Sequence, residues 1–206
     1  MSKIIDARII GLTGGIACGK STVARLLEQH GFPVIDADRL GHRGLEKGHP
    51  GFQEVVQAFG EDILDGRGHI SRPKLGTLVF QDPDKLEKLN RISHPHISSI
   101  IGKEARKLTK DQPGGVVFLE AALLIETGWH KQCWKIWIVT AEKETVLRRL
   151  AERNGLSREE AMLRIEVQMS QEDQLALADV ILPNEGSPRD LELALEKVLK
   201  ALRVNE

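Results

Sequence analysis

The sequence predicts a three-layer α/β sandwich built on a parallel sheet, because short apolar runs alternate with longer segments of helical spacing. The apolar runs at 9–12, 116–119, 136–139 and 180–182 are nearly uninterrupted, which is typical of strands that are buried on both faces. Glycines close several of the helical segments between them. The alternation indicates strands that run in one direction, with helices covering both faces of the sheet.

The N-terminal part of the chain is expected to form a strand, a glycine-rich loop and a helix. The strand at 9–12 leads into the loop at 14–21, and the helix at 20–29 ends before Gly31. A short second strand follows at 33–36 and ends in Asp36. Functional groups in α/β sheets gather at the carboxyl ends of parallel strands, so Asp36 is expected near the loop.

Residues 40–112 depart from this alternation, because they contain helical segments and turns but no strand pattern. We expect one helix at 50–59, one after Ser71, one that begins with Asp82 as its cap and Pro83 in its first turn, and a fourth after Pro95. We interpret 40–112 as a helical subdomain inserted into a single domain at 8–203. The core of that domain is then 8–39 together with 113–203.

The C-terminal part predicts further helices around the last strand. A helix at 142–154 is closed by Gly155, and the residues from Ser157 to Glu160 form a capping box that starts the next helix. Another helix runs from Ser187 to about residue 202. We expect residues 142–170 to form a helical lid.

Composition limits the classes of function. The chain has 206 residues, of which 41% are hydrophobic and 29% are charged, as in a globular domain. Its net charge of −1 argues against a general affinity for nucleic acid. Two cysteines, no apolar leader and no membrane-length apolar stretch predict a cytoplasmic protein without a membrane partner. The sequence leaves the oligomeric state open.

The loop carries the most specific motif in the chain, the phosphate-binding pattern G-x-x-x-x-G-K-[ST]. Its backbone N–H groups and the following helix N-terminus favour an anion. Lys20 is expected to reach the β- and γ-phosphates of ATP, and Ser21 to ligate Mg²⁺ as the metal ligand. The residues of this segment that we expect to bind ATP are Gly14, Gly15, Ile16, Ala17, Cys18, Gly19, Lys20, Ser21 and Thr22.

The rest of the motif content favours a small-molecule kinase over a GTPase. Residues 65–68 match D-x-x-G but lie between helical segments, which predicts a surface turn, and the chain has no guanine-reading N-K-x-D. Asp36 and Asp38 follow the second strand. Either a carboxylate there (Asp38 is favoured) accepts a hydroxyl proton or holds magnesium, or the pair only caps the next helix. Arg149 and Arg153, with Arg148, either close over the phosphates or form a solvated face.

The order and spacing of these and later segments resemble the dephospho-CoA kinase family, a family of P-loop kinases. The resemblance extends over about residues 8–186. The segments that carry it are 12–16, 34–38, 59–60, 71–76, 79–80, 94–97, 123–124, 149–150, 164–165 and 178–179, with Glu126, Arg153, Gln168, Asn184 and Gly186.

The resemblance implies a P-loop NTPase sandwich and transfer of the γ-phosphate of ATP to the ribose 3′-hydroxyl of dephospho-CoA, which makes coenzyme A. By position it implies Asp38 as the catalytic aspartate, Lys20 and Arg149 at the phosphates, and Asn184 in the adenine site, so that Arg149 and Asn184 also bind ATP. The residues expected to bind the acceptor are Asp36, Asp38, His94, Leu123 and Glu126.

Two positions depart from the family pattern. Glu120 stands where bacterial members usually carry aspartate, and residues 121–129 look more like the kinase domain of animal bifunctional coenzyme A synthases. Cys18 stands at a small polar position, either as a tolerated small residue or as an oxidation-sensitive thiol if the helix N-terminus lowers its pKa. The alternative functions are a kinase of the nucleoside-monophosphate type and a regulator that binds ATP without transferring phosphate.

Overall fold

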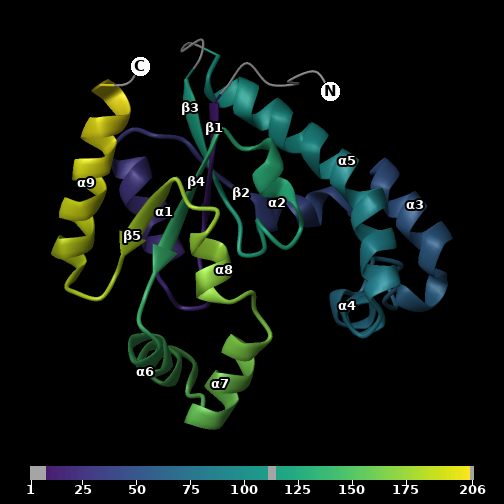
Figure 1. The fold of residues 1–206 in the computed structure, drawn as a ribbon. Coiled ribbons are helices and arrows are strands. Elements are labelled where there is room, and N and C mark those ends of the chain that lie inside the picture. The colour runs from purple at the N-terminus through teal and green to yellow at the C-terminus, as the bar shows by residue number, and fades with distance from the viewer. Residues whose placement is uncertain (1–7, 111–114, 205–206) are drawn as a thin grey trace.

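A computed structural model of the chain describes residues 8–110 and 115–204. Five parallel strands form one sheet in the order β2-β3-β1-β4-β5, with β1 at the centre (Figure 1). The strands are β1 (Arg8–Thr13), β2 (Val34–Asp36), β3 (Val116–Glu120), β4 (Lys135–Thr140) and β5 (Val180–Pro183). The predicted α/β class with a parallel sheet is confirmed. All the predicted strands form, within two residues of their expected ends.

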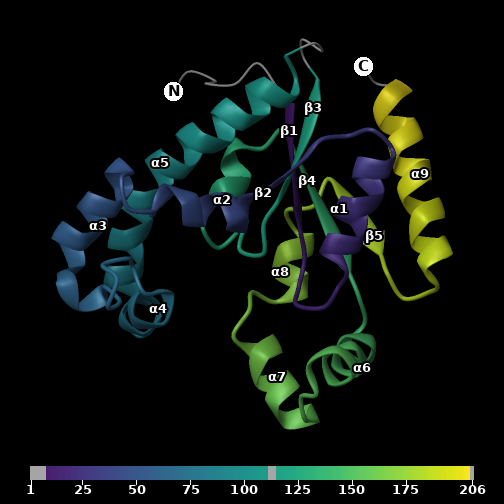
Figure 2. The same cartoon turned by 180° about the vertical axis from the view of Figure 1, so that it is seen from behind.

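Helices cover both faces of this sheet (Figures 1 and 2). Helices α1 (Lys20–Gln29) and α9 (Pro188–Val204) pack on one face, against Ile10 and Phe118 among others. Helix α2 (Ala37–Gly44) and the C-terminal half of α5 (Pro83–Leu108) pack on the other, against Ile9 and Val117. Neighbouring residues of one strand therefore face opposite layers, and this two-sided burial is why the strands read as continuous apolar runs.

The helices between β2 and β3 extend away from the sheet (Figure 1). They are α3 (Pro50–Phe59), a 3₁₀ turn at Glu61–Ile63, α4 (Arg72–Phe80) and the N-terminal half of α5. Their own apolar cluster centres on Val55, Ile63, Leu75 and Val79. Helix α5 also packs on the sheet through its C-terminal half, so it joins the two cores. The subdomain bounds 40–112 stay a prediction.

The prediction of separate helices on either side of Pro95 is wrong, because α5 is one helix of 26 residues with Pro95 inside it. Asp82 caps it as expected, by accepting hydrogen bonds from the N–H groups of Asp84 and Lys85. Pro95 has no N–H and leaves the carbonyl of Arg91 without its usual helical donor. Burial of Ile101 and Ala105 on the sheet keeps the helix continuous beyond that gap.

Helices α6 (Lys143–Asn154) and α7 (Arg158–Glu166) lie beyond the carboxyl ends of the strands, and the short α8 (Gln171–Leu175) packs against β4 (Figure 1). The capping box at the start of α7 is confirmed in both directions, since the Ser157 hydroxyl accepts from Glu160 N–H and Glu160 accepts from Ser157 N–H. The sequence did not predict α8 or the 3₁₀ turn at Trp129–Gln132. Within 8–110 and 115–204, every helix falls short of the length and apolar composition needed to cross a membrane.

Candidate active site

The glycine-rich loop joins β1 to α1 at the carboxyl edge of the sheet, and its shape depends on two glycines. Gly14 has a φ of 147° and Gly19 a φ of 104°, conformations that side chains disfavour. A Cβ at Gly14 would also overlap the carbonyl oxygen of Val139, and one at Gly19 would overlap the side-chain amide of Asn184. The backbone of β4 thus leaves room for glycine alone at position 14, while the positive φ and the Asn184 amide both favour glycine at position 19.

Lys20, the first residue of α1, lies folded over this loop. Its Nζ donates hydrogen bonds to the carbonyl oxygens of Gly14, at 2.7 Å, and Gly15, at 3.0 Å. Burial lowers the pKa of Lys20, while the negative charges of Glu120 and Asp38 act to raise it. The ammonium group is therefore half-buried between the phosphate loop and a set of carboxylates.

Two side chains from distant parts of the chain hold the other side of the loop. Asn184, which is buried directly after β5, donates from Nδ2 to the carbonyl of Cys18 at 2.7 Å. Arg149 of α6 donates from Nη1 to the carbonyls of Ala17 and Cys18, at 3.2 and 3.4 Å, and from Nη2 to that of Asn184, at 2.9 Å. The guanidinium thus joins the loop, helix α6 and the residue that follows β5.

Of the three arginines considered together in α6, Arg149 contacts the loop. Arg148 is exposed, and exposed Arg153 donates from Nε to Asn154 at 3.3 Å. The structure therefore distinguishes Arg149 from its neighbours, which their spacing alone did not do.

Gln168 also contacts the loop, and sequence patterns alone did not assign it this contact. Its Oε1 accepts a hydrogen bond of 2.8 Å from the backbone N–H of Ile16. Gln168 lies between α7 and α8 and lines a cleft of 250 Å³ that also includes Gly15, Cys18 and Lys143. The position was part of the family resemblance, but a lone glutamine carries no chemical signal that assigns it a role.

The carboxylates at the ends of β2 and β3 have different partners. Asp36 lies opposite Glu120 in the paired strands, and its Oδ1 accepts from the N–H of Arg39 at 2.8 Å, as a helix cap does. The Oδ2 of Asp38 accepts from the N–H of Ala122 at 3.2 Å. Asp36 therefore caps α2, whereas Asp38 is tied to the segment after β3.

Glu120 completes this acidic edge. Burial raises the pKa of Glu120, the charges of Asp36 and Asp38 raise it further, and Lys20 opposes the rise. The side chain is only half-buried, so water reaches it. The edge thus presents three carboxylates beside one lysine.

The remaining predicted acceptor residues lie at different depths near this edge. Leu123 and Glu126 are exposed in the segment after β3, and the charge of Glu126 acts on Lys20. His94 of α5 packs edge-on against Trp129, with ring centroids 5.9 Å apart, and burial lowers its pKa. Leu123 and Glu126 thus come from the segment beside Asp38, while His94 comes from the long helix.

We interpreted Cys18 either as a tolerated small residue or as an oxidation-sensitive thiol, and the structure favours the first. Only 3% of it is exposed, and burial raises the pKa of its thiol although Lys20 opposes the rise. A buried protonated thiol reacts slowly with oxidants. The structure argues against the alternative of a lowered pKa and an oxidation-sensitive loop.

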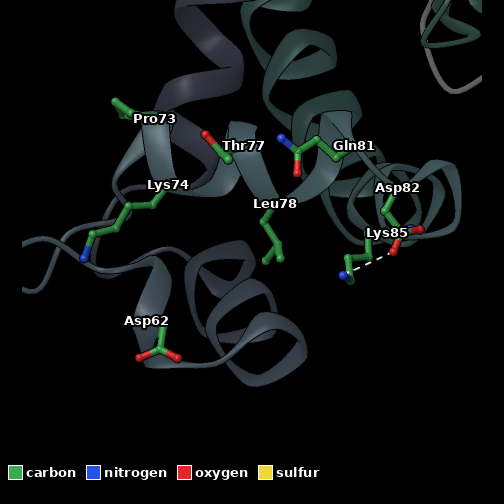
Figure 3. Close-up of a pocket in the computed structure, with 8 residues that line it drawn as sticks. All are labelled: Asp62, Pro73, Lys74, Thr77, Leu78, Gln81, Asp82 and Lys85. Carbon is green, nitrogen blue, oxygen red and sulfur yellow. Dashed lines mark hydrogen bonds and ion pairs between the residues drawn. The ribbon is translucent and has the colours of Figure 1, made fainter.

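A larger hollow, of 720 Å³, lies elsewhere, between α4, the 3₁₀ turn and the start of α5 (Figure 3). Its two cations already have partners, since Lys85 pairs with Asp82 at 3.1 Å and Lys74 donates to the carbonyl of Leu64 at 2.6 Å. No residue that the sequence singled out for binding lines it. The described residues that line the hollow also include no glycine, so it lacks the backbone cradle that the phosphate loop offers to an anion.

The donor atoms at the carboxyl edge fit a magnesium ion. Mg²⁺ prefers oxygen ligands and keeps several waters, so it needs only one or two protein groups beside the substrate phosphates. Ser21 is exposed and follows Lys20 in the first turn of α1, and exposed Asp38 lies within electrostatic range of the same lysine. Hydroxyl and carboxylate oxygens are thus available beside the loop, and the nearby thiol of Cys18 is buried.

Comparisons with known proteins point to one family. The model of the dephospho-CoA kinase family matches residues 8–190. The dephospho-CoA kinase of Carboxydothermus hydrogenoformans is 45% identical over 195 residues, which cover 95% of this chain and 93% of that protein. The crystal structure of TT1252 from Thermus thermophilus has a TM-score of 0.80 at 39% identity, covering 95% of this chain and 98% of that one. The dephospho-CoA kinase from Campylobacter jejuni has a TM-score of 0.68 at 29% identity, covering 96% and 98%.

Proposed function

This chain belongs to the dephospho-CoA kinase family and is an enzyme of coenzyme A biosynthesis, and we propose which of its residues perform the phosphoryl transfer. The reaction moves the γ-phosphate of ATP to the ribose 3′-hydroxyl of dephospho-CoA. The observation that carries the assignment of residues is the position of Asp38, which is tied to Ala122 and acts electrostatically on the loop lysine.

Asp38 is the proposed base. Its Oδ2 is held by the N–H of Ala122, which fixes the carboxylate and leaves Oδ1 without a hydrogen bond to any described residue. An acceptor hydroxyl that donates to Oδ1 is oriented for in-line attack and gives up its proton as the new P–O bond forms. Asp36 is less suited to this role, because its Oδ1 already caps α2.

Lys20 and Arg149 are the proposed cations at the phosphates. Lys20 exchanges its bonds to Gly14 and Gly15 for bonds to phosphate oxygens, which offset the charge that develops during transfer. Arg149 keeps the loop and Asn184 in one arrangement and places a positive charge beside the nucleotide. Ser21 and an acidic side chain would hold Mg²⁺, which would neutralise part of the phosphate charge.

The remaining assignments follow from position. We propose that Asn184 borders the adenine, and that His94, Leu123 and Glu126 border the acceptor. We also infer a reducing, cytoplasmic environment, because both Cys18 and Cys133 are free thiols.

The reaction is tested by offering labelled ATP·Mg²⁺ and a panel of acceptors that contains dephospho-CoA, AMP, CMP, adenosine and a 5′-hydroxyl oligonucleotide. We expect label on dephospho-CoA alone. Label on a nucleoside monophosphate instead would mean that the helices at 40–112 select a different acceptor. ATP binding with no transfer to any acceptor would contradict catalysis.

The role of Asp38 is tested by Asp38→Asn, which keeps the shape of the side chain and its acceptor oxygen but removes the charge. We expect kcat to fall by about 10²–10⁴, with ATP affinity within a few-fold of the wild type. Asp36→Asn is the matched control, because asparagine caps a helix as well as aspartate does, and its kcat should fall much less. Near-full turnover in Asp38→Asn, or an equal loss in both variants, would exclude Asp38 as the base.

A further inference from the structure

Three side chains of types that can ligate a metal come together between the end of α1 and α9. His30 is the C-cap of α1, and Glu192 and Glu196 stand four residues apart on α9. One ligand atom from each lies within 4.8 Å of the other two. Figure 2 shows α9 lying alongside α1, and both helices belong to the same apolar core.

These side chains converge without bonding one another. Within 8–110 and 115–204, none of the three forms an ion pair or a side-chain hydrogen bond, although all three are half-buried. Elsewhere, a single histidine and glutamate do form such a pair, since His96 Nε2 lies 3.0 Å from Glu54 Oε1. The imidazole nitrogens therefore lie beyond ion-pair distance of both carboxylates, while one ligand atom of each residue stays within 4.8 Å of the other two.

The backbone around the three residues is firmly held. The N–H of His30 donates to the carbonyls of Leu26 and Leu27 at the end of α1. Positions i and i+4 of a helix lie on the same face, so Glu192 and Glu196 project together toward α1. Buried Leu191 and Leu195 fix α9 in the core beside them. Only side-chain rotations are then needed to bring the ligand atoms onto one ion.

We propose that His30, Glu192 and Glu196 form a binding site for a divalent transition-metal ion of the zinc class. One imidazole nitrogen and two carboxylates suit Zn²⁺, whereas Mg²⁺ favours an all-oxygen shell. Ligand distances of about 2.0–2.2 Å require the three atoms to move inward slightly from their present spacing. Three protein ligands leave a fourth position for water.

The site is separate from the ATP site. His30 follows the last residue of α1, and the phosphate loop precedes the first, so the helix puts about 15 Å between them. Zinc binding there therefore needs no nucleotide, and a measurement without ATP avoids chelation of the metal by the phosphates. An ion at this position would join the end of α1 to α9.

The test is titration of the untagged enzyme with Zn²⁺ by calorimetry, in excess Mg²⁺ and without ATP. We expect one zinc ion per chain, and affinity reduced by at least about tenfold in His30→Ala and in Glu196→Gln. His96→Ala is the matched control, because His96 has only one carboxylate partner, and it should bind zinc as the wild type does.

A second measurement uses thermal unfolding, where zinc should raise the melting temperature of the wild type and of His96→Ala but not of His30→Ala. If His30→Ala does not fold, Glu192→Gln takes its place in both measurements. No zinc binding by the wild type, or wild-type affinity in either His30→Ala or Glu196→Gln, overturns the proposal.

Discussion

Glu120 shows how a single ionisable side chain links the site to stability. Burial and the charge of Asp36 raise the pKa of Glu120 above its ordinary value, so folding favours its protonated form. Below the ordinary carboxyl pKa both folded and unfolded chains are protonated there, and the residue has little effect. Above that range the folded state has to hold an ionised carboxylate in an unfavourable place.

Glu120→Gln should therefore raise the free energy of unfolding at neutral pH, because the amide carries no charge. The difference from the wild type should shrink as the pH falls through the carboxyl range. Denaturation midpoints measured over a series of pH values check this. A variant that is less stable at neutral pH would mean that the attraction between Glu120 and Lys20 outweighs the burial.

Gly14 is the position in the loop where any side chain would be least tolerated. Gly14→Ala combines an unfavourable φ with an overlap on Val139, so we expect ATP affinity to be lost. Gly31→Ala is the control, since Gly31 has a φ of 83° but no atom within 4 Å of the position that an alanine methyl group would occupy. It should cost about 1–2 kcal/mol of stability and keep ATP binding. Calorimetric ATP titration compares the ATP affinities of the two variants. ATP binding by Gly14→Ala would contradict the steric argument.

For single residues, the sequence predicted the positions of the loop residues well, but it predicted the roles of the carboxylates only in part. The loop motif is contiguous, so its spacing alone places Lys20 and Ser21 at a helix N-terminus. Spacing alone could not distinguish the role of Asp36 from that of Asp38. The difference between them depends on the N–H of Ala122, which is 84 residues further along the chain.

Among the elements, the sequence led to a wrong prediction for the length of α5. Proline inside a helix normally indicates a break, and Pro95 would have been a break if local propensity alone decided. The apolar residues on both sides of it pack into two different cores, so tertiary contacts keep the helix intact. The strands, in contrast, were predictable because each is an apolar run with no competing signal.

Pro95→Ala tests this explanation. Alanine supplies the missing N–H for the carbonyl of Arg91, and Pro95 is exposed, so the free energy of unfolding should rise by up to about 3 kcal/mol. Pro83→Ala, in the first turn of the same helix, should change stability much less, since proline is well tolerated there. Chemical denaturation compares them, and a destabilised Pro95→Ala variant would show that the proline itself contributes to packing.

On the scale of the whole molecule, the chain has two apolar cores against the sheet and a third in the helices that extend from it. The third core is small and is connected to the sheet mainly through α5. Regions with few buried contacts open more readily than the centre of a domain. We expect α3 and α4 to exchange their amide hydrogens faster than β1 and β3.

Leu75→Ala should increase the difference in amide exchange rate between α3 and α4 on one side and β1 and β3 on the other. Removing a buried leucine costs about 2–5 kcal/mol, and here the loss should fall mainly on α3, α4 and the start of α5. Leu195→Ala, which removes the same atoms from the core beneath α9, should speed exchange in the strands as well. Hydrogen exchange with mass spectrometry resolves the two patterns, and equal loss of protection in the strands for both would mean that the molecule opens as one unit.

The hydrogen bond from Asn184 to Cys18 has a consequence for the order of events during synthesis. It joins residues that are 166 positions apart, and both strands that flank β1 come at least 100 residues after it. The phosphate loop leaves the ribosome early, but Arg149 and Asn184, which hold it, follow more than 130 residues later. A nascent chain therefore carries the nucleotide motif long before it can bind a nucleotide, and emergence of the last strand determines when the enzyme first becomes active.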